Sequence, residues 1–183
     1  MNYYRKSFFA AAVLLSSLFL ISCDQTSDQQ ADGSTSTQAT AAETVNSKSG
    51  SYVAMSNTNV SVEDGEQFTL QVLANDFSTS EGGAITLYFN PELLQVTSIN
   101  VDSSVWDFVS KNGQIDNAKG SISDILFSSY KGVTGDAVIA TIEFKAVNSG
   151  SSNVTIEESA ANPFASNGEA MTVTFVTTNV TSN

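Results

Sequence analysis

The sequence predicts an all-β protein, whose main domain is a roughly nine-stranded antiparallel β-sandwich of jelly-roll-like type. Two observations support this fold class. Apolar and polar residues alternate with a period of two along much of residues 51–183, which is the pattern of strands with one buried face. Clusters of Gly, Asn, Asp and Pro separate these runs at the spacing typical of turns in a sandwich.

The first half of the domain contains the clearest alternation. A strand is expected over 52–62, and Asp64-Gly65 forms the turn after it. Two further strands follow, with a turn at Gly82-Gly83 between them. The inward residues are Phe68, Leu70 and Val72 in the first strand and Ile85, Leu87 and Phe89 in the second. Asn90-Pro91-Glu92 ends the second of them, because proline cannot donate a hydrogen bond within a sheet.

The second half continues the same pattern with shorter runs. Strands are expected over 94–101, 106–110, 122–128, 138–146, 153–157 and 171–178. The turns between them are Asn112-Gly113, Lys119-Gly120 and Asn167-Gly168, each with a glycine that adopts positive φ without strain. Ile125 and Phe127 form the inward set of the strand over 122–128.

Residues 1–22 are typical of a signal peptide. Two basic residues precede an apolar run over 8–21, which is shorter than the about 20 residues of a membrane-spanning helix. Residues 20–23, Leu-Ile-Ser-Cys, resemble the lipobox of bacterial lipoproteins, which implies that Cys23 is lipidated. Cys23 is the only cysteine, so it has no partner for an internal disulfide. We expect a bacterial cell-envelope protein, anchored by lipid to the inner or the outer membrane.

Residues 23–50, which begin with Cys23, form the expected tether. From Asp24 on they are rich in Ser, Thr, Gln, Ala and Asp and contain one bulky aliphatic residue, Val45. Such a segment buries too little apolar surface to offset the entropy of ordering it. A chain of this length has a mean reach of about 30 Å, so the domain over 51–183 is expected to stand away from the lipid surface.

Composition excludes several function classes. Without the signal peptide, five lysines face 19 acidic residues, a net charge of −14, so nucleic acid is not an expected partner and the lipid anchor is the only expected membrane contact. The chain has no histidine, and its one cysteine precedes the domain, which removes the usual reagents of Ser-His-Asp and Cys-His catalysis and of zinc sites. We therefore expect a protein that is not an enzyme.

Four stretches of the domain resemble the bacterial cohesin domain. They are 60–72 (VSVEDGEQFTLQV), 85–96 (ITLYFNPELLQV), 135–146 (GDAVIATIEFKA) and 160–168 (AANPFASNG). The resemblance spans nearly all of 51–183 and implies a non-catalytic module. It would bind a dockerin, a small calcium-loaded helical module on another protein, in the context of polysaccharide degradation. No cofactor is implied in this chain, because the calcium is expected on the partner.

The resemblance places the partner-binding surface on one flat sheet face. Alternation then predicts which side chains point outward, given that their neighbours are in the core. The predicted partner-binding residues are Ala84, Thr86, Tyr88, Asp124, Leu126 and Ser128. Ala84 stands where cohesins have a polar contact residue, which distinguishes this face from the usual one.

Two other functions remain open at this stage. The domain could bind a glycan directly, as related carbohydrate-binding modules do, with Trp106 and Tyr130 as stacking residues. It could also be a structural subunit of an envelope assembly. No metal site is predicted, although Asp102, Asp107 or Asp116 could contribute to calcium binding.

Overall fold

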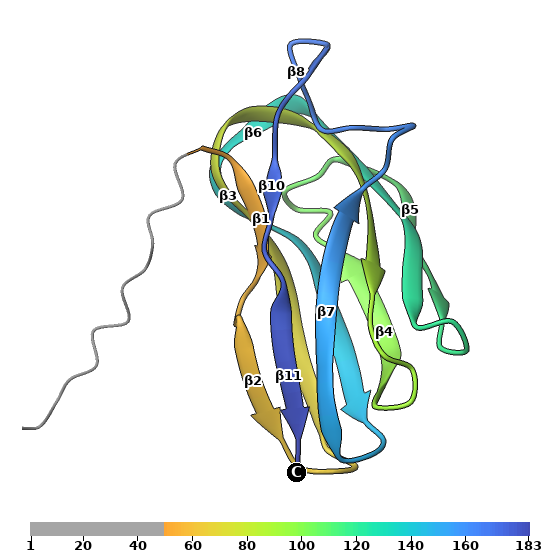
Figure 1. The fold of residues 1–183 in the computed structure, drawn as a ribbon. Helices are drawn as coiled ribbons and strands as arrows, with labels where there is room; N and C mark the ends of the chain where they lie inside the picture. The colour runs from red at the N-terminus through yellow and green to blue at the C-terminus, as the bar shows by residue number, and fades with distance from the viewer. Residues whose placement is uncertain (1–49) are drawn as a thin grey trace, which may run out of the picture. The chain divides into compact units, whose positions relative to one another are not determined.

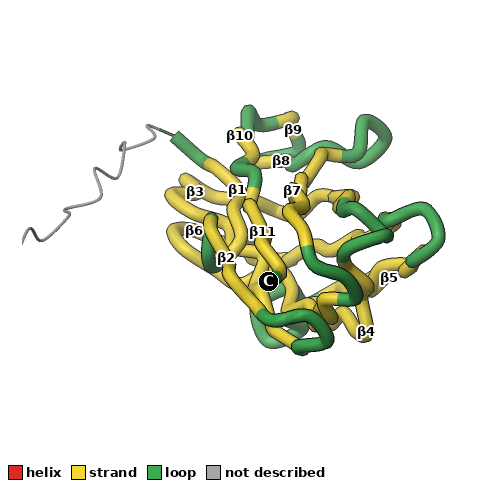
Figure 2. Tube along the Cα trace, turned by 60° about the horizontal axis from the view of Figure 1, so that its bottom comes forward, coloured by secondary structure: helices red, strands yellow, loops and turns green. Residues whose placement is uncertain are grey.

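The computed structural model describes residues 50–183. The expected signal peptide, Cys23 and the tether up to residue 49 lie outside the described residues. Every regular element of the described part is a strand (Figures 1 and 2). No helix in this part of the chain is long and apolar enough to cross a membrane. The predicted all-β class is confirmed.

Eleven strands make up the described part. They are β1 (Tyr52–Met55), β2 (Asn59–Val62), β3 (Gln67–Tyr88), β4 (Leu94–Val101), β5 (Phe108–Asp116), β6 (Ser121–Ala146), β7 (Gly150–Glu158), β8 (Ala165–Ser166), β9 (Glu169–Ala170), β10 (Thr174–Phe175) and β11 (Thr178–Ser182). The alternation located the bounds of β4 correctly. It merged β1 with β2 and β10 with β11, and it divided β3 and β6.

The two long strands β3 and β6 belong to both layers of the sandwich. They pair with each other along their whole course and curve over at the end of the domain where β8 lies (Figure 1). One layer, here called sheet I, contains β5, residues 121–128, residues 82–88, β7, β11 and β2. The other, sheet II, contains β4, residues 137–146, residues 67–74, β1 and β10.

The Gly82-Gly83 pair lies inside β3, so the predicted turn there is wrong. Gly82 has φ +128°, and the register between β3 and β6 shifts just before it. A Cβ on Gly82 would collide with the carbonyl of Phe127, and one on Gly83 would lie 3.1 Å from Phe164. These glycines therefore let the backbones approach closely where β3 passes from one sheet to the other.

The core lies between the two sheets and contains the predicted inward sets, except that Phe68 is only half-buried. Aromatic rings fill the end beneath the curve of β3 and β6. Phe127 packs edge-on against Trp106 and Phe164, with ring centroids 4.7 and 5.8 Å away, and Phe77 meets Phe164 at 5.5 Å. The indole of Trp106 is fully buried and donates a hydrogen bond to the carbonyl of Val138 at 2.9 Å.

Two asparagine side chains cover the edge of β4 that faces away from β6. Asn112 accepts a hydrogen bond from the amide of Val101 and donates one to the carbonyl of Ile99. Asn117 bonds both the amide and the carbonyl of Val96, at 2.8 and 2.9 Å. The predicted turn at Asn112-Gly113 is wrong, because both residues lie within β5. Their position there allows an amide side chain to substitute for a missing strand.

We predict that Asn117→Ala and Asn112→Ala each lower the free energy of unfolding by about 1–3 kcal/mol, because each leaves a backbone N–H and a carbonyl of β4 without their partner. Urea denaturation measures the change. Asn100→Ala, an exposed site on β4 itself, is the matched control and is expected to change stability by less than about 0.5 kcal/mol. Equal effects at all three sites would show that the edge bonds contribute nothing specific.

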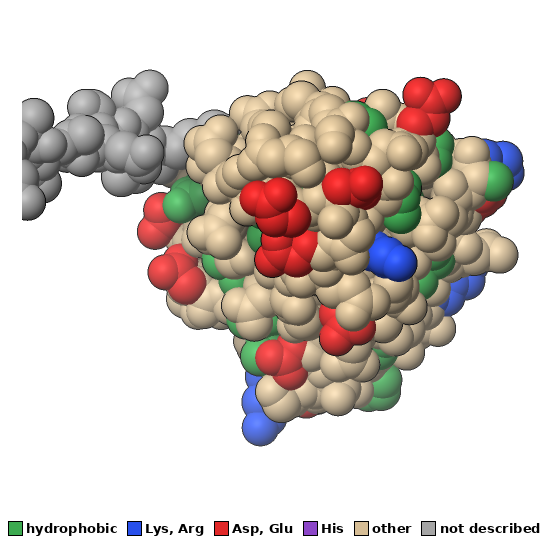
Figure 3. All heavy atoms as spheres, turned by 90° about the horizontal axis from the view of Figure 1, so that it is seen from below, with side chains coloured by type: hydrophobic (Ala, Val, Ile, Leu, Met, Phe, Trp, Pro, Cys, Tyr) green, Lys and Arg blue, Asp and Glu red, His purple; other side chains and the backbone are tan. Residues whose placement is uncertain are grey.

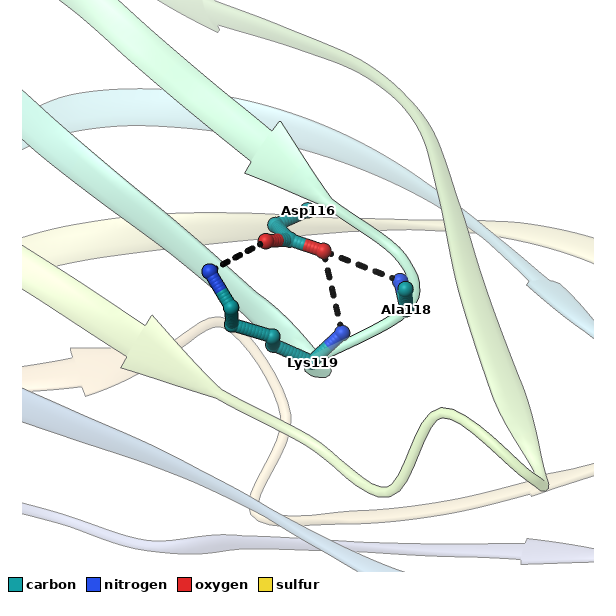
Figure 4. A network of polar contacts seen from close by, with 3 residues as sticks. All are labelled: Asp116, Ala118 and Lys119. Atoms are coloured by element: carbon teal, nitrogen blue, oxygen red, sulfur yellow. Dashed lines mark hydrogen bonds and ion pairs between the residues drawn. The ribbon is translucent and has the colours of Figure 1, made fainter.

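The turn between β5 and β6 is organised by Asp116 (Figure 4). Its carboxylate accepts hydrogen bonds from the amides of Ala118 and Lys119 and pairs with the Lys119 ammonium at 3.1 Å. The side chain of Lys119 and then its amide are the main causes that lower the pKa of Asp116 below its usual value. This carboxylate therefore stabilises the fold above its ordinary pKa, and the contribution is lost as the pH falls through the lowered pKa.

Candidate functional site

The candidate site is the outer face of sheet I, on the four neighbouring segments β5, 121–128, 82–88 and β7. Register places its side chains in rows across the strands. Tyr88 lies opposite Thr155 of β7, and Thr86 lies opposite Glu157. Phe108 of β5 lies opposite Ser128, which in turn lies opposite Gly82. The inward neighbours Ile85, Leu87, Ile125 and Phe127 are all fully buried, so the predicted direction of alternation is confirmed.

Five of the six predicted partner-binding residues reach the surface of this face. Tyr88 is 42% exposed. Asp124 and Ser128 are exposed, and Thr86 and Leu126 are half-buried. Together they form a mixed surface with one aromatic and one aliphatic side chain among short polar groups. Their role in binding stays a prediction.

Ala84 lies on the outer side by alternation, opposite Leu126, but it is buried, so the expectation that it offers a partner a contact surface is wrong. It is 5% exposed. On one side it pairs with Leu126 of β6. On the other, the segment over 159–162 extends the pairing beyond the end of β7, since the Ala84 amide donates to the carbonyl of Asn162 and its carbonyl accepts from the amide of Ser159. Both backbone edges of Ala84 are therefore paired, and its methyl group has almost no surface to offer a partner.

A bulge in β6 shapes the centre of the face. Between the pairs Ile85 with Ile125 and Leu87 with Ile122, β6 contains one residue more than β3. Asp124 lies in this bulge with φ +57° and forms an ion pair with Lys111 of β5 at 3.2 Å. Thr86 therefore lies between the bulge on one side and the exposed carboxylate Glu157 on the other. The centre of the face offers hydroxyl and carboxylate groups to a ligand.

Phe108 is a surface residue that the sequence analysis missed. Its ring is 58% exposed at the start of β5. Alternation counted from Trp106 puts Phe108 on the buried side, because the two residues are two positions apart. The strand begins only at Phe108, however, and Trp106 belongs to the preceding segment. The half-buried Val109 is the first inward residue of β5, so Phe108, the residue before it, points outward.

The two predicted glycan-stacking residues have opposite environments. Trp106 is fully buried, so the interpretation of it as an exposed stacking platform is wrong. Tyr130 is 88% exposed and lies beyond the end of the face. A hollow of about 430 Å³ is lined by Glu81, Phe108, Ser128, Ser129 and Tyr130. The exposed aromatic side chain that the structure brings beside Tyr130 is thus Phe108 rather than Trp106.

The three carboxylates considered for calcium binding each interact with a different part of the domain. Asp102 accepts bonds from the amide and hydroxyl of Ser104, and Asp107 accepts one from the hydroxyl of Ser129 at 3.3 Å. Asp116 organises the β5–β6 turn. Within residues 50–183, no three acidic, histidine or cysteine side chains gather in a way that could hold a metal ion.

The two-layer architecture and the outer face of sheet I define a β-sandwich module with an exposed sheet surface. The family comparison then gives the particular family. The family model described as the cohesin domain matches residues 53–182, most of the chain and nearly all of its described part. The protein belongs to the cohesin family.

Solved structures support the same fold. The cohesin CaCohA2 of Clostridium acetobutylicum is 17% identical and aligns with a TM-score of 0.59 over 72% of this chain and 91% of its own. The OlpA cohesin in a type I cohesin–dockerin complex of Clostridium thermocellum is 15% identical. It aligns with a TM-score of 0.59 over 73% of this chain and 99% of its own. A non-cellulosomal cohesin of the archaeon Archaeoglobus fulgidus is 15% identical, and it aligns with a TM-score of 0.53 over 73% of this chain and 91% of its own. No curated protein matched the sequence.

Proposed function

We propose that this protein is a non-catalytic binding module that recruits a dockerin-like partner through the outer face of sheet I. One observation carries the proposal: Tyr88, Leu126 and Phe108 are presented to solvent on a flat sheet face in a chain of the cohesin family. The C. thermocellum neighbour was solved in complex with a dockerin. The link to polysaccharide degradation belongs to this proposal and rests on the same resemblance.

The chemistry of the face suits a helical partner. The exposed aromatic and aliphatic side chains are of the kind that contributes most binding free energy when a partner buries them. Thr86, Asp124, Ser128 and Glu157 add hydrogen-bonding groups between them, which fix the orientation of a docked helix. A flat sheet of this kind accepts a helix lying across it without a preformed cleft.

The proposal includes the location of the module. A lipid on Cys23 would hold the chain at an envelope membrane, since several acyl chains anchor a protein far more firmly than one. A flexible tether of this length has a mean reach of about 30 Å, which would give the domain room to meet a partner away from the lipid surface. Such an arrangement would concentrate a captured partner at the cell envelope.

The test captures the partner with the unlipidated chain, Cys23→Ser, immobilised in calcium and then in chelator. The prey are secreted and envelope proteins from the source organism, identified by mass spectrometry. We expect retention of a protein that carries duplicated calcium loops, and its release on chelation, because a dockerin needs calcium for its fold. Retention of no such protein, with binding to a polysaccharide instead, would contradict the proposal and favour direct glycan recognition.

A further inference from the structure

The hollow beside Phe108 has a chemical character unlike the rest of the face. Phe108 and Tyr130 expose 58% and 88% of their surface beside it. Glu81 contributes a carboxylate, and Ser128 and Ser129 contribute hydroxyl groups. The hollow therefore combines two accessible aromatic rings with one anionic group at the end of the face far from Tyr88.

The carboxylate of Glu81 is held in place but keeps an unused oxygen. Its Oε2 accepts a hydrogen bond from the amide of Gly168, in the turn between β8 and β9, at 3.0 Å. No ion pair involves Glu81 within the described residues, whose two ion pairs join Lys111 to Asp124 and Lys119 to Asp116. A cation entering the hollow would not have to displace a lysine from Glu81.

We propose that this hollow binds a cationic side chain, arginine or lysine, of the docked partner. This inference rests on the proposed function and deepens it by naming the chemistry of one partner residue. A guanidinium or ammonium group is attracted to the faces of aromatic rings and to a carboxylate at once. The net charge of −12 adds a long-range attraction for a basic partner.

An apolar side chain fits the hollow less well. It would cover Phe108 and Tyr130 but would take the Glu81 carboxylate and the Ser128 hydroxyl out of water without replacing their hydrogen bonds. The stem of an arginine or a lysine covers the rings equally well, and its charged end satisfies the carboxylate. The juxtaposition of two rings and one acid therefore favours a cationic side chain.

The test uses a probe that needs no partner. The full chain with Cys23→Ser is titrated with N-acetyl-arginine N-methylamide and followed by two-dimensional NMR, with the citrulline analogue as a neutral probe of the same shape. We expect saturable shifts at the amides of residues 81 and 128–130 with the arginine probe, and binding weaker by roughly three- to fivefold with citrulline. Glu81→Gln and Tyr130→Ala should each weaken the arginine probe by a similar factor.

Matched variants at the other end of the face complete the design. Glu157→Gln removes an exposed carboxylate, and Tyr88→Ala removes an exposed ring, and neither should change the binding of the probe. Equal shifts with both probes, or no effect of Glu81→Gln, would overturn the inference. Shifts at these amides with cellohexaose and none with arginine would assign the hollow to a glycan instead. Neither result would affect partner capture, which fails only if the proposed function fails.

Discussion

Gly82→Ala is expected to lower the free energy of unfolding by about 3 kcal/mol. The new Cβ would collide with the carbonyl of Phe127 and lie 2.5 Å from the Cα of Ser128, both of them backbone atoms that cannot rotate away. Gly82 also has φ +128°, where an L-residue is strained. Overpacking and backbone strain each cost about 1–3 kcal/mol.

Gly65→Ala separates these two causes. Gly65 also has positive φ, +83°, but a Cβ there meets no atom within 4 Å, so only the strain remains and a loss of about 1 kcal/mol is expected. Urea denaturation of both variants measures the difference. If the two losses are equal, the close approach of β3 and β6 relaxes easily, and the role assigned to Gly82 at the passage between the sheets is wrong.

Tyr88→Ala combined with Leu126→Ser is expected to weaken partner binding at least about 30-fold, because truncation of hot-spot side chains, among which tyrosine is enriched, costs about 2 kcal/mol or more. Both side chains project from the outer face of sheet I, so folding should be unchanged. Calorimetric titration with the captured partner measures the affinity, and circular dichroism with thermal unfolding checks the fold.

The control for this double variant is Leu73→Ser, a half-buried leucine on the part of β3 that belongs to sheet II. It makes the same chemical change as Leu126→Ser in the other layer of the sandwich. Partner affinity should stay within about twofold of the unmodified chain. Unchanged affinity in the double variant, or an equal loss in the control, would show that the partner does not bind the outer face of sheet I.

Alternation predicted the strands of this fold where both faces of a strand have contrasting environments. β4 is the clearest case, since its bounds, 94–101, are those expected from the sequence. β3 was divided because Gly82-Gly83 is typical of a turn, and β6 was divided because alternation was recognised only over 122–128 and 138–146. In the structure Gly82 of β3 and Gly132 and Gly135 of β6 have positive φ inside continuous strands. Glycine permits both outcomes, and only tertiary packing selects between them.

The candidate face was predicted less completely than the fold. Tyr88 and Ser128 reach the surface because alternation holds next to the core residues Leu87 and Phe127. Asp124 also reaches it, although it lies in the bulge of β6, where alternation is interrupted. Ala84 is buried although alternation puts it on the outer side, at a position where a segment distant in sequence, 159–162, pairs with its backbone. Phe108 was missed because the strand starts after Trp106. The alternation of side chains between the two faces can be counted along one regular strand, but it cannot be carried past the end of the strand into the next segment.

The terminal strands are paired in a way that local sequence could not predict. β10 runs parallel to β1 in sheet II, and β11 runs parallel to β2 in sheet I. The two chain ends therefore cross from one sheet to the other side by side. At this crossing the amide of Asn179 donates to the carbonyl of Thr58, and the hydroxyl of Thr178 donates to the carbonyl of Asn57.

This pairing determines how the domain would respond to a mechanical load. β1 is flanked by β3 and β10, and the described chain enters it at the end of the domain opposite to the C-terminus (Figure 1). A pull on residue 50 along the axis of β1 would load the hydrogen bonds on both of its edges simultaneously, in shear. The surface seen from below in Figure 3, at the other end of the domain, carries more acidic than basic side chains. The rate of unfolding governs how long a domain survives under force. If the module were pulled between an envelope membrane and a captured partner, the hydrogen bonds of β1 to β3 and β10 would therefore set its resistance to extension.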